Sequence, residues 1–143
     1  MTKVRISEFQ GENRFLSNFY HAPLRVLGIP FLNSEAAYQA CKSLDTDVRY
    51  QFSTLDAGAA KKLGRRITVR PNWDDGITKV ECMELCLWAK FQMNPDLKEK
   101  LINTGDAELI EGNNWGDVFW GVCKGQGQNM LGKLLMEVRT NIK

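Results

Sequence analysis

The sequence has little histidine, and its cysteines are scattered. His21 is the one histidine among 143 residues, and none of the four cysteines forms a Cys-x-x-Cys pair. A structural zinc ion needs closely grouped nitrogen and sulfur ligands, so we expect no metal site. The glycines between Gly121 and Gly132 lack the strand–turn–helix context of a dinucleotide fold. We therefore expect no cofactor, and chemistry carried by side chains alone.

Long apolar runs and a strong net charge are also missing. No stretch reaches the length of a membrane span, and no leader or lipidation motif is seen. The net charge is +2, so a nucleic acid would be held by a local pocket rather than by a basic field. Together with the unclustered cysteines, these features predict a cytoplasmic protein without a membrane partner. They imply no protein partner.

The apolar pattern predicts a single domain over residues 1–143, with an α+β fold that is mostly helical and has short strands. Strands are expected at 4–9, in a ribbon over 24–31 with Gly28 at the turn, at 66–70 and at 107–111. Helices are expected at 34–42, 56–63 and 77–93, from Pro95 to Gly105, and at 129–142. Residues 113–128, rich in glycine and tryptophan, are expected to form a loop.

The segment 34–42 is the most informative part of the chain. Ser34 is a good N-cap, because its hydroxyl can accept from the free N–H groups of a first helical turn. Four polar residues then share one helical face at i, i+3, i+4 and i+7: Glu35, Tyr38, Gln39 and Lys42. The opposite side suits packing on a core: Ala37, Ala40, Cys41 and Leu44. A narrow stripe of carboxylate, phenol, amide and amine is typical of a cleft wall.

Two further stretches combine aromatic and polar residues. Residues 13–20 gather aromatic and amide groups in an expected loop, and residues 114–121 set tryptophans and an aspartate among glycines. Aromatic faces can stack on a nucleobase, and a carboxylate can hold ribose hydroxyls or assist proton transfer. The alternative is that Trp115, Phe119 and Trp120 are core residues. Asp117 fits a core less well, because a buried aspartate needs a partner.

Several motifs together resemble the NADAR (YbiA-like) family of N-glycosidases. They are Phe15–Tyr20, Ser34–Lys42, Ala59–Arg65, Lys90–Leu97, Trp115–Gly121 and Gly127–Met136, in the family's order. The resemblance implies a compact, mostly helical α+β fold. It also implies hydrolysis of a ribosylated base, most readily the release of ADP-ribose from guanine in nucleic acid. The alternatives are hydrolysis of phosphoribosylamino-pyrimidine intermediates of riboflavin synthesis and a binding module that holds ADP-ribose without cleaving it.

The resemblance also implies roles for individual residues. Glu35 would organise acid–base work, Lys42 would form a Schiff base with the opened ribose, and Asp117 would assist at the sugar. The implied substrate-binding residues are Ser17, Asn18, Phe19, Tyr38, Gln39, Trp88, Trp115, Trp120, Gly121 and Asn129. Asn129 joins this group because an expected helix start offers free N–H donors to an anion.

Two positions depart from the family pattern. Ala36 stands where many relatives have histidine, and His21 stands where many have proline. A mechanism that requires the family histidine is therefore not carried over to this chain.

Lysine chemistry at Lys42 requires the neutral amine, which a partly apolar pocket favours. Without the resemblance, Lys42 would be interpreted as a solvated surface lysine. The basic cluster Lys61-Lys62 and Arg65-Arg66 is interpreted as solvated helix ends rather than as a phosphate site.

Overall fold

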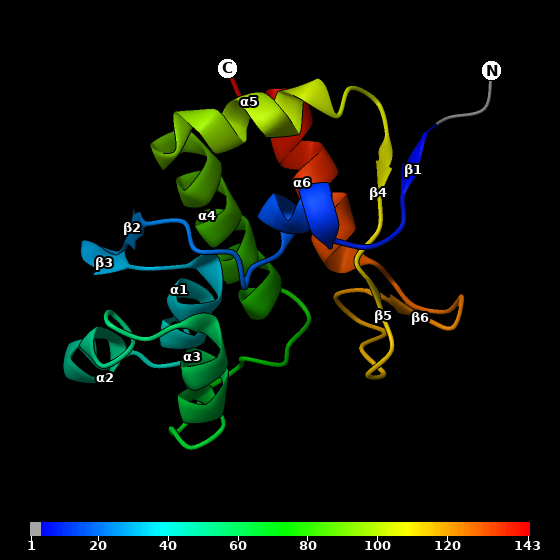
Figure 1. Ribbon diagram of the computed structural model, residues 1–143. Coiled ribbons are helices and arrows are strands. Elements are labelled where there is room, and N and C mark those ends of the chain that lie inside the picture. Colours follow the sequence, from blue (N-terminus) through cyan, green and yellow to red (C-terminus); the bar gives the residue numbers. More distant parts are fainter. Residues whose placement is uncertain (1–3) are drawn as a thin grey trace. The chain divides into compact units, whose positions relative to one another are not determined.

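The computed structural model describes residues 4–143, which divide into two compact units (Figure 1). One is continuous and runs over Asn18–Pro95. The other combines the stretch that ends at Ser17 with Asp96–Lys143. We call them the central unit and the terminal unit, after their positions in the sequence.

The central unit contains a β-ribbon followed by helices. Its elements are β2 (Leu24–Val26), β3 (Ile29–Phe31), α1 (Ser34–Ala40), α2 (Thr46–Tyr50), α3 (Ala57–Gly64) and α4 (Thr78–Met93). Strands β2 and β3 pair antiparallel, and Leu27 and Gly28 between them have φ of 55° and 76°. A tight type I′ hairpin needs positive φ at both central residues. The predicted ribbon with its turn at Gly28 is confirmed.

Helix α1 begins and ends differently from the prediction. Asn33 is the N-cap, because its extended backbone lets the side-chain oxygen accept from the Ala36 N–H at 2.7 Å. Ser34, predicted as the cap, is instead the first residue of the helix. The helix ends at Ala40, so Lys42 lies in the turn that follows. Helical spacing therefore does not extend to Leu44, which is 61% exposed rather than packed on the core.

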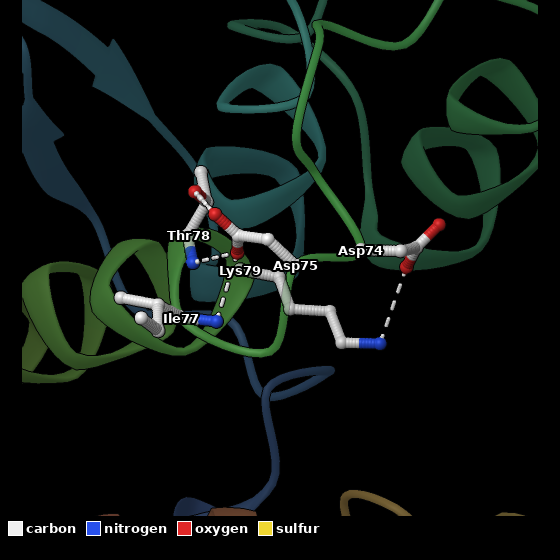
Figure 2. A network of polar contacts seen from close by, with 5 residues as sticks. All are labelled: Asp74, Asp75, Ile77, Thr78 and Lys79. Atoms are coloured by element: carbon white, nitrogen blue, oxygen red, sulfur yellow. Dashed lines mark hydrogen bonds and ion pairs between the residues drawn. The ribbon is translucent and has the colours of Figure 1, made fainter.

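Aspartates begin the next long helices. Asp56 accepts from the Ala59 N–H at 2.8 Å and caps α3, as predicted. Asp75 accepts from the N–H groups of Ile77 and Thr78 at 2.9 and 2.8 Å and from the Thr78 hydroxyl at 3.0 Å (Figure 2). These hydrogen bonds lower the pKa of Asp75, the one from the Thr78 backbone most. Helix α4 matches the predicted helix over 77–93 to within a residue.

One further prediction for the central unit fails, and one helix was not predicted. Residues 66–70 are irregular rather than a strand, and the Arg70 N–H donates to the Lys42 carbonyl at 2.7 Å instead of to a neighbouring strand. Helix α2 was not predicted, because five residues are too short to show a helical period. It is capped by Asp45, which accepts from the N–H groups of Asp47 and Val48.

The core of the central unit forms around α1, which packs on α3, α4, α2 and the ribbon. Every residue of α1 is buried, including its polar ones. Of the α4 residues at apolar helical spacing, Met83, Leu87 and Phe91 are buried and Val80 is half-buried. Burial of a helix on all sides allows polar side chains only where they find partners.

The terminal unit contains short parallel strand pairs and a long final helix. Its elements are β1 (Arg5–Ile6), the 3-10 helix η1 (Gly11–Leu16), α5 (Pro95–Asn103), whose first residue closes the central unit, β4 (Glu108–Leu109), β5 (Gly112–Asn113), β6 (Val122–Cys123) and α6 (Met130–Asn141). Strand β1 pairs with β4 and β5 with β6. Helix α6 packs on β4 and buries Leu131, Leu135 and Val138.

These elements confirm the predicted fold class: helices dominate, and the strands are two or three residues long. The predicted strands at 4–9 and 107–111 are present but shorter, and the expected loop over 113–128 contains β6. The assignment to a single domain stays a prediction. No helix among residues 4–143 has both the length and the apolar character of a membrane span.

Candidate functional site

Glu35 and Gln39 form a buried polar pair on α1. Gln39 Nε2 donates to Glu35 Oε2 at 2.6 Å, and the two residues are 5% and 8% exposed. The i, i+4 spacing stacks them on one helical face, as predicted. A carboxylate can only accept, so Nε2 must be the atom that faces it. The amide thus fixes one oxygen of a carboxylate that is largely shielded from water.

Asn18 holds the first turn of α1. Its backbone carbonyl accepts from the Glu35 N–H at 3.2 Å, and its side-chain oxygen accepts from the Ser34 hydroxyl at 2.9 Å. Its Nδ2 donates to Met83 Sδ at 3.2 Å. The amide of Asn18 is therefore engaged with the protein, and contact with a substrate stays a prediction.

Lys42 is half-buried in the turn after α1. Burial is the largest effect on its amine and lowers its pKa below the usual 10.5. Arg65 and Lys61 lower the pKa further, whereas the negative charges of Glu35 and Asp74 oppose them. A lysine in these surroundings releases its proton more readily than a solvated one, as a nucleophilic amine requires.

The predicted aromatic residues of the central unit differ in exposure. Phe19 is 39% exposed, and Lys61 Nζ lies 5.9 Å from its ring centroid, within cation–π range. Tyr38 is buried, and its ring is tilted against Trp73 with centroids 5.5 Å apart. Burial, with a smaller contribution from Glu35, raises the pKa of Tyr38, which keeps the phenol protonated. Trp88 is half-buried on α4.

The sequence reasoning missed Lys90 on α4. This lysine is fully buried, and burial lowers its pKa to about 7. Its Nζ lies 5.2 Å from the ring centroid of Phe91. A signal was available, because Lys90 falls at helical spacing from Met83 and Leu87 and therefore on the apolar face. Complete burial denies a substrate access to this amine.

Asp117 shapes the loop around it. Its Oδ1 accepts from the N–H groups of Trp120 and Phe119 at 2.9 and 3.2 Å. Asn113, which the sequence reasoning left out, accepts from the Asp117 N–H at 3.0 Å and donates to its carbonyl at 2.9 Å. Asn113 also donates to Glu111 Oε2 at 3.0 Å. Asp117 thus has the partners that an aspartate in an apolar loop needs.

Trp115 is 60% exposed, so it is not a core residue. It lines an open pocket of about 470 Å³ in the terminal unit, together with Asn113 and Asn114. Phe119 and Trp120 are half-buried and meet edge to face, with ring centroids 4.8 Å apart. An exposed indole beside a pocket offers a flat surface to a base.

Other predicted residues of the terminal unit have structural contacts. Gly121 is buried, and a Cβ there would collide with the Glu111 carbonyl and carboxylate oxygens. The Asn129 side chain accepts from the Glu111 N–H and donates to the Leu109 carbonyl, both at 2.9 Å. Ser17 ends η1, where its N–H donates to the Arg14 carbonyl. The N–H groups of Met130 and Leu131 at the start of α6 donate to the Phe119 and Trp120 carbonyls, so, contrary to the prediction, they are not free for an anion. Ligand binding by Ser17, Gly121 and Asn129 stays a prediction.

The structure thus groups the predicted residues within each unit. Asn18, Phe19, Glu35, Tyr38, Gln39, Lys42 and Trp88 belong to the central unit, and Ser17, Trp115, Asp117, Trp120, Gly121 and Asn129 to the terminal unit. Over residues 4–143, no three His, Cys, Asp or Glu side chains are placed to hold a metal ion. The central unit therefore supplies a shielded carboxylate–amide pair and an amine with a lowered pKa, and the terminal unit supplies an exposed indole.

Comparisons with known proteins assign the chain to a family. The family model for the NADAR domain matches residues 7–143. The chain belongs to the NADAR family, and the predicted resemblance is confirmed.

The chain is similar both to proteins named N-glycosidases and to a protein named for riboflavin biosynthesis. It is 35% identical to N-glycosidase YbiA of Escherichia coli over 130 residues, covering 88% of this chain and 79% of that protein. It is 34% identical to an N-glycosidase of Nostoc punctiforme, covering 89% of this chain and 84% of that protein. It is 39% identical to a riboflavin biosynthesis protein of Vibrio vulnificus over 90% of this chain, which spans only 35% of that protein.

A solved structure supports the fold. The NMR structure of Escherichia coli YbiA superimposes with a TM-score of 0.86 at 32% identity, covering 99% of this chain and 86% of that one. The predicted YbiA-like α+β fold is confirmed.

Proposed function

We propose that this chain removes ADP-ribose from guanine in nucleic acid by hydrolysing the C1–N bond of the ribose. The coarser class rests on relatives that are named N-glycosidases and align with most of the chain: the protein is a hydrolase that acts on N-glycosyl bonds. The observation that carries the proposal is Lys42, a half-buried amine with a lowered pKa shortly after the Glu35–Gln39 pair.

The proposed reaction begins with cleavage of the C1–O4′ bond of the ribose: the lone pair of the base nitrogen forms a C=N bond to C1, which gives an iminium, and the ring oxygen takes up a proton to become a hydroxyl. The neutral Lys42 amine adds to C1, and a proton transferred through Glu35 allows the base nitrogen to leave as an amine. The remaining imine between Lys42 and C1 then takes up water, which releases the sugar as an aldehyde and restores the lysine. The addition to C1 needs an unprotonated amine, and the departure of the base and the hydrolysis of the imine need a nearby group that moves protons.

The terminal unit contributes recognition in this proposal. The exposed face of Trp115 stacks on a ring of the substrate, and Asp117 assists at the sugar. The other residues proposed to contact the substrate are Asn18, Phe19, Tyr38, Gln39 and Trp88 in the central unit, and Ser17, Trp120, Gly121 and Asn129 in the terminal unit. The four cysteines are free thiols, which suits the reducing cytoplasm that we propose as its location.

The test is incubation with guanine-ADP-ribosylated DNA, with release of ADP-ribose followed by mass spectrometry. Borohydride added during turnover reduces an imine to a stable amine, so a sugar adduct should be found on Lys42. An adduct on another residue would reject the covalent role of Lys42. Absence of release from this DNA would reject the proposed substrate.

A second substrate is favoured by one observation, the 39% identity to a riboflavin biosynthesis protein. Phosphoribosylamino-pyrimidine should therefore be offered beside the modified DNA under identical conditions. Faster turnover of the pyrimidine would move the assignment to that substrate. Tight calorimetric binding of ADP-ribose without turnover of either compound would instead indicate a binding module.

A further inference from the structure

Gly64, the last residue of α3, lies against the side chain of Gln39. A Cβ built on Gly64 would collide with Gln39 Oε1 and would lie 2.7 Å from its Cδ and 3.3 Å from its Cγ. Those three atoms are the nearest neighbours of that position. The end of the Gln39 side chain therefore occupies the space that any other residue at position 64 would fill.

The backbone gives no other reason for glycine at this position. Gly64 is helical and is not among the residues with positive φ, and the C-cap after it, Arg65, has a φ of −79°. The glycine that often ends a helix instead adopts the left-handed conformation. Alanine is the better helix former, so a helical glycine here weakens α3 unless space requires it. The space is taken by Gln39.

The position of the Gln39 side chain is unfavourable for one of its two polar atoms. Its Oε1 is buried and has no hydrogen-bond partner among the described residues, which is unfavourable for an amide. Its Nε2 makes the short hydrogen bond to Glu35. The Gln39 side chain therefore keeps its hydrogen bond to the Glu35 carboxylate, although its own oxygen has no hydrogen-bond donor among residues 4–143 in this position.

We infer that Gly64 is a positioning residue, whose missing side chain lets Gln39 lie across α3 and fix the orientation of the Glu35 carboxylate. The inference rests on the proposed role of Glu35 in proton transfer. Gly64 acts only through Gln39, and Gln39 acts through Glu35. A group as small as one methyl on α3 is then enough to disturb the carboxylate.

The test compares four variants with the wild-type protein on the substrate it cleaves: Gly64→Ala, Gly58→Ala, Gln39→Ala and the double variant Gln39→Ala/Gly64→Ala. Gly58→Ala is a matched control, because Gly58 is exposed on the same helix and its added Cβ would meet only Asp56 Oδ1, at 3.6 Å. We expect kcat of Gly64→Ala to fall about 100-fold with KM little changed, as for a small misplacement of a reacting group. Gly58→Ala should keep wild-type activity.

The double variant separates positioning from damage to the fold. Shortening Gln39 to alanine removes the atoms with which a Cβ at position 64 would collide, so the double variant can fold even if Gly64→Ala cannot. If Gly64 acts through Gln39, the double variant is no slower than Gln39→Ala alone. Losses that multiply, a matching loss in Gly58→Ala, or a change confined to KM would each overturn the inference.

A spectroscopic arm does not depend on turnover. The Gln39 side-chain amide can be identified in a ¹⁵N-correlated NMR spectrum as the signal absent from Gln39→Ala. It should move in Gly64→Ala and stay in place in Gly58→Ala. A wild-type protein that cleaves neither substrate would defeat the proposed function, whereas an unmoved amide signal in a folded Gly64→Ala protein would defeat the positioning role.

Discussion

Lys42 and Lys90, in two regions of the central unit, both have amines withdrawn from water, yet they differ in what can reach them. In both, burial is the largest cause of a lowered pKa. Lys42 is only half-buried in the turn after α1, whereas Lys90 lies fully buried within α4. A nucleophilic amine must be neutral and also accessible. A lowered pKa alone therefore does not identify a candidate nucleophile, because Lys42 combines it with partial exposure to solvent whereas Lys90 does not.

The largest expected effect on activity comes from Lys42, the accessible lysine of the pair. Lys42→Ala should lower kcat by roughly 1000-fold or more, because removal of a nucleophile abolishes the covalent route. Lys62→Ala, at an exposed lysine of α3, is the control and should behave as wild type. The measurement is the steady-state rate of ADP-ribose release at saturating substrate. Turnover of Lys42→Ala near the wild-type rate would show that Lys42 is not the nucleophile.

The Lys90 amine should instead make the free energy of unfolding depend on pH. Its folded-state pKa of about 7 lies below the ordinary 10.5, so between these values the unfolded chain holds one more proton than the folded one. Raising the pH through this window favours the folded state, by at most about 1.4 kcal/mol per pH unit.

The matching variant is Lys90→Met, which keeps an unbranched side chain one atom shorter and removes the titrating amine. Urea unfolding at pH 7, 8 and 9 should show wild-type stability rising relative to that of Lys90→Met. Parallel curves for the two proteins would mean that the Lys90 amine is not held neutral by the fold.

The pH dependence of borohydride trapping sharpens the assignment of Lys42. The amine reacts only when deprotonated, so the trapping rate should rise with pH through the pKa of Lys42 and level off above it. Because that pKa is lowered, the midpoint should lie below 10.5. Trapping that still rises steeply beyond pH 10.5 would indicate an ordinary, solvated lysine.

The smallest expected effect comes from two charges near Lys42. Asp74 raises the pKa of Lys42 and Arg65 lowers it. Asp74→Asn should therefore move the midpoint of the trapping profile to lower pH, and Arg65→Gln should move it to higher pH. Asp74 also pairs with Lys79 at 3.3 Å (Figure 2), an exposed contact that contributes little to stability. Shifts of the same sign in both variants would contradict an electrostatic cause.

The parts of the fold that could be predicted have local signals. Gly28 permits positive φ at a turn, Asp56 caps a helix, and Pro95 opens one. The failures arise where neighbours compete or where tertiary contacts decide. Asn33 and Ser34 are both good caps, and only the observed backbone selects Asn33. Residues 66–70 have a strand-like composition, but the backbone N–H of Arg70 donates to the carbonyl of Lys42 in a turn instead of to a neighbouring strand.

The candidate site shows the same division. Spacing along α1 was enough to predict that Glu35 and Gln39 share a face. The importance of Gly64 was not visible, because its contact with Gln39 joins residues 25 positions apart on two packed helices. The same holds for Asn113, whose role depends on the conformation that the loop around Asp117 adopts.

The pairing of β1 with β4 has a consequence for biosynthesis. Arg5 and Glu108 face each other across this pair and form an ion pair at 3.2 Å, although the continuous unit over Asn18–Pro95 is encoded between them. A ribosome adding about 5–20 residues per second needs roughly 5–20 s to supply the second strand after the first. During that delay the intervening unit can fold, while β1 has no partner strand. An unpaired strand edge on a nascent chain is prone to aggregation, which chaperones prevent.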